Sequence, residues 1–200
     1  MKDGLDLDIV GWDIRKALFL YQKANPQLME WLQSPIYKDT RGLREMLYNR
    51  LPQFYERERC YHHYYGMAQN NFRDYILKWR TAKIKKYLYV LRSVWACHYA
   101  IDMSKPLPIP IKFDVLRNHL PNVGKPNAEI DRILQIKLDR PAENVEIERS
   151  QELDDYIIQQ LSELSAGRDR FDELNLNQKW KSEEAERIAD LDEIFWGMVT

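Results

Sequence analysis

The sequence predicts a mainly α-helical protein: a multi-helix, bundle-like domain with one strand at its N-terminus. Apolar residues recur at helical spacing through most of the chain. The first such stretch holds Ile14, Ala17, Leu18 and Tyr21. Residues 5–9 instead alternate between apolar residues and aspartates, which is the period of a strand. Prolines and capping residues separate one apolar stretch from the next, so several helices of moderate length are expected.

The composition is that of a globular protein, with 44% hydrophobic and 30% charged residues among 200. A net charge of -1 argues against a uniformly basic surface, so any phosphate-binding surface is expected to be local. No apolar run approaches the ~20 residues that span a bilayer, and no signal-peptide core is present. Cys60 and Cys97 fit no metal-binding spacing. We therefore expect no membrane partner, a cytoplasmic location and two buried thiols.

The caps and prolines set the expected helix boundaries. A first helix opens at residues 11–13, and Asn25 caps a short second helix that has Pro26 at its first position. Pro52 is expected to close the third helix, and residues 141–149 to form a loop. Helices are further expected over 41–51, 57–79, 82–101, 113–120, 128–138 and 150–167.

Asp6 and Asp8 are the first candidate site. Carboxylates at i and i+2 of a strand project from the same face, and such oxygen ligands suit a divalent cation. The alternative is an edge strand whose acidic face is simply solvated.

Three strings, taken in order, resemble a known family. They are LDIVGWDIRKAL at residues 7–18, NPQLMEWLQSP at 25–35 and KKYLYVLR at 85–92. Together they look like the predicted nucleotidyltransferases of the DNA polymerase beta superfamily that are associated with RNA repair. The resemblance covers residues 5–120 and extends to about 165.

The resemblance implies metal-dependent transfer of a nucleotidyl group from a nucleoside triphosphate to an RNA or other hydroxyl acceptor. In that superfamily three carboxylates bind two Mg²⁺ (or Mn²⁺) ions. Asp8 matches the third carboxylate, a catalytic metal ligand, and Asp6 is its neighbour. The resemblance also implies three parts: residues 1–38 as the remnant of a nucleotidyltransferase α/β domain, 39–167 as a helical domain and 168–200 as a charged helical tail.

The sequence departs from the family pattern before Asp8. The family has a Gly-Ser turn and an Asp-x-Asp pair well upstream of its third carboxylate, and this chain contains no Gly-Ser dipeptide. We therefore expect a truncated chain that is inactive alone, with the strand left over from a larger sheet. The alternative is a non-catalytic helical module that binds RNA or a partner protein. The oligomeric state stays open.

A basic face is the second candidate site. Lys85, Tyr89 and Arg92 fall at i, i+4 and i+7 of a helix, with Lys86 nearby. Such a face suits a triphosphate or an RNA backbone, with the tyrosine stacking on a base; the alternative is a solvated cationic face. Lys16 is a further candidate phosphate ligand. The remaining positions from the matched strings are Trp12, Asp13, Asn25, Glu30 and Ser34, for which core packing, capping or a turn is the competing interpretation.

Overall fold

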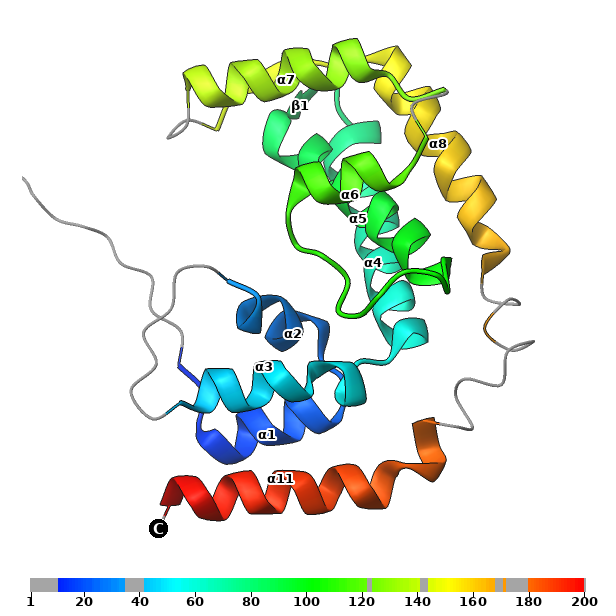
Figure 1. Ribbon diagram of the computed structural model, residues 1–200. Coiled ribbons are helices and arrows are strands. Elements are labelled where there is room, and N and C mark those ends of the chain that lie inside the picture. Colours follow the sequence, from blue (N-terminus) through cyan, green and yellow to red (C-terminus); the bar gives the residue numbers. More distant parts are fainter. Residues whose placement is uncertain are drawn as a thin grey trace, which may run out of the picture.

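The computed structural model shows a mainly α-helical chain, which confirms the predicted fold class (Figure 1). It describes residues 11–34, 42–121, 124–140, 144–167, 171 and 180–199. The predicted strand at 5–9, with Asp6 and Asp8, lies outside these residues. The helices are α1 (Ile14–Gln22), α2 (Pro26–Leu32), α3 (Leu43–Phe54), α4 (Arg57–Phe72), α5 (Ile84–Ile101), α6 (Phe113–His119), α7 (Asn127–Asp139), α8 (Gln151–Ser165) and α11 (Glu184–Val199).

Helix α5 is the centre of the structure. Eleven of its 18 residues are buried, and α4, α6, α7 and α8 all pack against it. Its indole, Trp95, is fully buried and donates a hydrogen bond from Nε1 to the hydroxyl of Tyr156 on α8 at 3.1 Å. A buried indole N–H needs such a partner, because an unpaired donor costs free energy in an apolar core.

A buried carboxylate fixes α8 on the first half of α5. Asp154 is 1% exposed, accepts a 2.8 Å hydrogen bond from the Tyr87 hydroxyl and pairs with Arg149 at 2.7 Å. Burial of a charge is tolerated only when it is paired and hydrogen-bonded. Ser150 caps α8 as predicted, its hydroxyl accepting from the Leu153 N–H at 3.4 Å.

Helices α1, α2, α3 and α11 form a second layer at the lower end of the molecule in Figure 1. A tight turn joins α1 to α2, with Ala24 in the left-handed region at φ 50° and fully buried. Asn25 then caps α2 as predicted, its side chain accepting from the Leu28 N–H at 3.1 Å. This turn sets the direction of α2 and therefore the position of its charged residue, Glu30.

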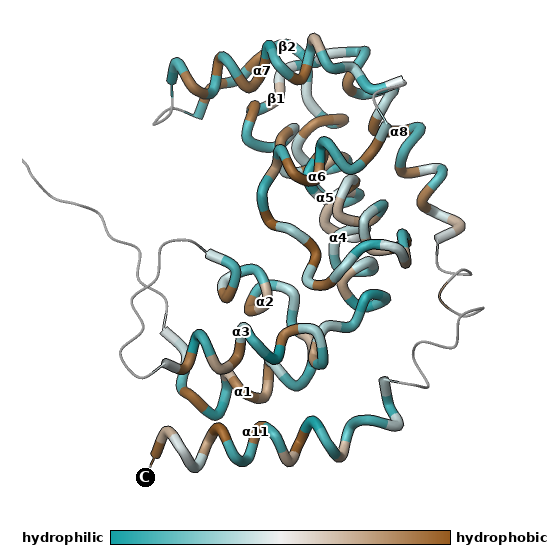
Figure 2. The backbone as a smooth tube through the Cα atoms, in the orientation of Figure 1, coloured by the Kyte–Doolittle hydropathy of each residue, from teal (hydrophilic) through white to brown (hydrophobic). Residues whose placement is uncertain are grey.

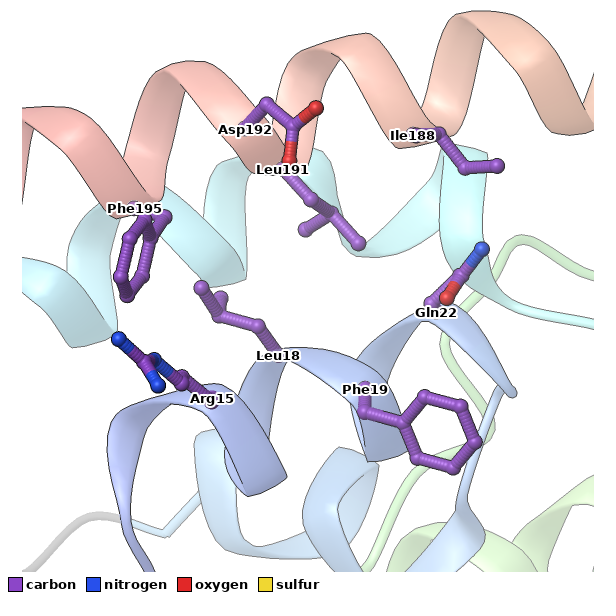
Figure 3. Close-up of a pocket in the computed structure, with 8 residues that line it drawn as sticks. All are labelled: Arg15, Leu18, Phe19, Gln22, Ile188, Leu191, Asp192 and Phe195. Carbon is purple, nitrogen blue, oxygen red and sulfur yellow. The ribbon is translucent and has the colours of Figure 1, made fainter.

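Helix α11 packs against α1 and α3 although it lies far from them in the sequence. Figure 2 shows apolar and polar stretches alternating along α11, the pattern of a helix with one apolar face. In Figure 3, Leu18 and Leu191 point toward one another between the two helices, and Arg15 lies beside Phe195. The guanidinium carbon of Arg15 is 5.6 Å from the Phe195 ring centroid. These contacts leave an open groove of about 430 Å³ between the helices.

Four boundary predictions are wrong. The helix expected at 57–79 changes to a π-helical turn, η1 (Arg73–Leu77), and ends there. The helix expected at 82–101 begins with a strand, β1 (Thr81–Lys83), which pairs antiparallel with β2 (Glu146–Glu148) in the expected loop. Strands of three residues are too short to show a period.

The fourth wrong boundary is that of α3, which continues through Pro52 to Phe54. Phe54 is fully buried, and the burial of its ring favours the last turn despite the hydrogen bond that proline removes.

The two cysteines are free and buried, as the sequence predicts. Burial raises the pKa of the Cys60 thiol to about 12, so the reactive thiolate is scarce at neutral pH. None of the helices in the described part of the chain is long and apolar enough to cross a membrane.

We expect Leu191→Ala to release α11 from the fold. Leu191 is 6% exposed, and truncating a buried leucine costs about 2–3 kcal/mol. Arg187, four residues earlier, is 3% exposed, so trypsin reaches it only when α11 opens. Tryptic cleavage after Arg187 should therefore be at least about tenfold faster than in the parent chain. Val199→Ala is the control, because Val199 is 50% exposed. Equal cleavage rates in L191A and the parent chain would show that this contact does not hold α11.

Candidate functional site

A cleft of about 670 Å³ lies between α2, α4 and α5, with α6 and α7 contributing to its walls. This volume is within the usual range for small-molecule sites. Its walls are mainly apolar and aromatic, with a few polar groups. The lining residues are Gln27, Glu30, Trp31, His63, Met67, Leu88, Tyr89, Arg92, Phe113 and Leu134.

An ion pair between α2 and α5 crosses the cleft. Arg92 Nη2 lies 3.2 Å from Glu30 Oε1, and their side chains are 22% and 23% exposed. The hydroxyl of Tyr64, on α4, donates a 2.7 Å hydrogen bond to the same carboxylate oxygen. Burial, and then the negative charge of Glu30, raise the pKa of Tyr64 well above its ordinary value. Tyr64 therefore stays protonated and holds the carboxylate in place.

The pair also limits what the cleft attracts. The charges of Glu30 and Arg92 compensate each other, so the cleft does not present a strong positive field to a triphosphate. Arg92 Nε is buried and makes no hydrogen bond with the described residues. Glu30, whose side chain is 23% exposed, offers acceptor oxygens to the cleft.

Trp12 and Trp31 extend the aromatic wall beyond the cleft. Their ring centroids are 4.4 Å apart with an interplanar angle of 27°, and both side chains are partly buried. Lys16, one turn further along α1, has its ammonium 5.4 Å from the Trp12 ring centroid. The first matched string thus meets the second one through this stack.

The predicted basic face is divided between two surfaces. Tyr89 lines the cleft at 39% exposure, and the ammonium of Lys85 lies 5.5 Å from its ring centroid. Lys86 faces elsewhere: its ammonium is 3.5 Å from the Tyr75 ring centroid and donates to Asn71 Oδ1 at 3.1 Å. Residues at i and i+1 of a helix point about 100° apart, so these two lysines serve different neighbours.

Three other candidate positions have local structural roles. Asp13 caps α1, its Oδ1 accepting from the Arg15 N–H at 2.9 Å. Asn25 caps α2, as described above. Ser34 follows the end of α2 and donates its backbone N–H to the Trp31 carbonyl at 3.0 Å. None of the three lines the cleft.

No cluster of three or more histidine, cysteine or acidic residues suited to a metal ion occurs in the described ranges. Asp6 and Asp8, the candidate metal ligands, lie outside those ranges. Their oxygen donors are of the kind that Mg²⁺ and Mn²⁺ prefer. The donor chemistry of the pair therefore fits the metal that the resemblance implies.

Only Glu30, Tyr89 and Arg92 of the cleft residues are candidates from the sequence. Gln27, Trp31 and Leu88 fall within the matched strings without being named as ligands, and four more lie outside those strings: His63 and Met67 of α4, Phe113 of α6 and Leu134 of α7. They come from helices that pack around α5, and pairing between helices leaves no trace in local spacing. The only signal was the unusual run of histidines and tyrosines at 61–65.

We expect Glu30→Ala to destabilise the fold by about 1–3 kcal/mol, because it leaves Arg92 and the Tyr64 hydroxyl without their shared partner. The control is Asp131→Ala, which removes a 2.5 Å ion pair with Arg117 from a side chain that is 64% exposed. That change should cost at most about 1 kcal/mol. Urea unfolding measures both. Equal losses in the two variants would show that the cleft ion pair is no more than a surface contact.

The comparisons with known proteins agree with the sequence strings. Residues 2–188 match the RNA repair pathway DNA polymerase beta family, RlaP. Over 143 residues the chain is 39% identical to "Uncharacterized protein YcgL" of Bacillus subtilis (strain 168), an alignment that covers 71% of this chain and 53% of the relative. The chain thus spans about half the length of this curated relative. No solved structure matches. The matched region includes all three strings, and the chain belongs to the RNA repair pathway DNA polymerase beta family.

Proposed function

We propose that this chain serves metal-dependent transfer of a nucleotidyl group from a nucleoside triphosphate to a hydroxyl acceptor, with RNA as the acceptor. Membership of the polymerase beta family supports the reaction class. The proposal includes Mg²⁺ or Mn²⁺ as cofactor and a cytoplasmic location, in keeping with the free, buried thiols. Because the chain spans about half of its relative, the proposal concerns the activity of the whole protein.

The observation that supports the proposal is that the second and third strings line one cleft and the first string packs against it. Glu30 and Trp31 come from the second string, and Tyr89 and Arg92 from the third. Trp12, from the first, stacks on Trp31. Residues far apart in the sequence that gather around one cavity are the usual composition of a ligand site.

The chemistry of the cleft favours the nucleoside part of the substrate. The rings of Tyr89 and Trp31 offer surfaces on which a base can stack. The Glu30 carboxylate accepts hydrogen bonds of the kind that a ribose hydroxyl or an exocyclic amine donates. We place the base and ribose here because the compensated ion pair leaves little field for three phosphates.

The phosphates are assigned to Lys16 and Lys85, with Asp8 and Asp6 as the metal ligands. Both lysines are exposed and lie beside aromatic rings at the edge of the cleft region. A bound divalent ion supplies charge neutralisation on the phosphates and activation of the attacking hydroxyl. The lysines add positive charge that compensates the phosphate oxygens and orients the chain of phosphates.

We expect Tyr89→Ala to weaken nucleotide binding about tenfold, because it removes a stacking surface. The matched control is Tyr48→Ala. Tyr48 is 40% exposed against 39% for Tyr89, and it too carries a cation over its ring, that of Arg44. Binding is measured by anisotropy of a fluorescent ATP analogue. An unchanged affinity in Y89A, or an equal loss in Y48A, would refute the position of the base.

We expect Asp8→Asn to remove the Mg²⁺-dependent part of nucleotide affinity while the metal-free affinity stays unchanged, since only the metal contact is lost. Asp190→Asn, an aspartate on α11, is the control. The measurement is ATP-analogue binding with Mg²⁺ and with EDTA. Mg²⁺-dependent affinity that persists in D8N would contradict the metal-binding role of Asp8.

A further inference from the structure

A second surface lies outside the cleft, at the corner formed by η1, β1 and β2, and it combines exposed aromatic rings with lysines. Its core is a pocket of about 440 Å³. Figure 1 shows β1 at the upper end of the molecule, away from α1 and α11. We call this surface the β-corner platform; it is lined by Tyr75, Trp79, Thr81, Lys83, Lys86 and Glu146.

The platform exposes large aromatic rings. Trp79 is 60% exposed and Tyr75 is 51% exposed. The Trp79 indole is nevertheless held in place, because its Nε1 donates a 3.1 Å hydrogen bond to the Asp74 carbonyl. Lys86 lies against the Tyr75 ring at 3.5 Å. The Trp79 ring is fixed at its edge, while Lys86 covers one face of the Tyr75 ring and leaves the rest of that ring exposed. Exposed rings that are held in place suit stacking, since little conformational entropy is lost on binding.

Cations surround these rings. Residues 73–86 hold six lysines and arginines, of which Lys85 lies on the cleft side beside Tyr89, and one carboxylate, that of Asp74. Glu146 and Glu148 of β2 also border the platform. Most of the pairs that these cations form are on the surface: Lys78 with Asp74 at 2.7 Å, and Arg80 with Glu148 at 3.6 Å with side chains 90% and 80% exposed. Exposed ion pairs contribute little free energy, so the cations exchange carboxylates for phosphates at small cost.

We propose that the β-corner platform binds an unpaired strand of nucleic acid, with bases stacked on Trp79 and Tyr75 and the backbone on the surrounding cations. Aromatic rings interleaved with lysines are typical of single-strand binding surfaces. The core of a protein–protein interface is instead depleted of lysine. A π-helical turn such as η1 also occurs often at functional sites. The platform shares no residue with the lining of the cleft, so strand binding can be tested separately from nucleotide binding.

The test is anisotropy of a fluorescein-labelled single-stranded RNA of about 12 nucleotides, without NTP or divalent metal, at several salt concentrations. We expect binding that weakens with salt. Trp79→Ala should weaken RNA binding about 5- to 100-fold. Trp79→Phe should keep most of the affinity of the parent chain, because an aromatic ring remains. Tyr75→Ala gives a second, independent variant. Trp196→Ala is the control, because Trp196 is 62% exposed on α11 at the opposite end.

The outcomes separate cleanly. The proposal is supported if single-stranded RNA, or DNA of the same sequence, binds the parent chain and W196A but not W79A. The strand that binds more tightly is then the preferred ligand of the platform. Equally tight binding of a double-stranded RNA of the same length and sequence overturns stacking on unpaired bases. No binding of either strand at low salt overturns the proposal and leaves a protein partner as the occupant of this surface. Circular dichroism of each variant confirms that the fold is retained.

Discussion

The structure depends on the burial of α5. A helix with so few exposed residues has to be covered on nearly all sides, and α4, α6, α7, α8, the η1 turn and strand β1 do this. Coverage is complete over the second half, from Val94 to Cys97, and incomplete over the first, where Lys85 and Tyr89 are exposed. The two surfaces proposed for binding therefore lie along the first half of α5, where Lys85 and Tyr89 reach solvent.

The Glu30–Arg92–Tyr64 network connects the two layers of the molecule at the cleft. Glu30 belongs to the lower layer, and Arg92 and Tyr64 belong to the upper one. A partly buried ion pair that also accepts a hydrogen bond from a third side chain fixes the relative positions of the helices more than it adds to the free energy of unfolding. Because the charges of this ion pair compensate each other, the cleft has a low net charge and suits a nucleoside. The basic β-corner platform is a separate surface, which suits a strand of nucleic acid. One helix thus presents Tyr89 to the first surface and Lys86 to the second.

The sequence predicts the helical class and most helices, because caps such as Asn25 and Ser150 and the apolar spacing are local signals. It misplaces the β1–β2 pair, since three-residue strands carry no period and their pairing joins residues 65 positions apart, as in the hydrogen bond between Thr81 and Glu146. The cleft is only partly predictable. Tyr89 and Arg92 follow from helical spacing, whereas Phe113 and Leu134 come from helices whose packing on α5 is a tertiary property. Lys85 and Lys86 lie on different surfaces because their side chains contact different neighbours, Tyr89 and Tyr75, and this too is a tertiary property.

The central claim is that the three family strings meet to form a nucleotide site. Photo-cross-linking with 8-azido-ATP, followed by mass-spectrometric mapping of the labelled peptides, tests it most directly. We expect labelling of peptides from α2 and α5, at or beside Trp31 and Tyr89, and we expect excess ATP to suppress it. Labelling confined to the α1–α11 groove or to the β-corner platform, or labelling that excess ATP does not suppress, would contradict it.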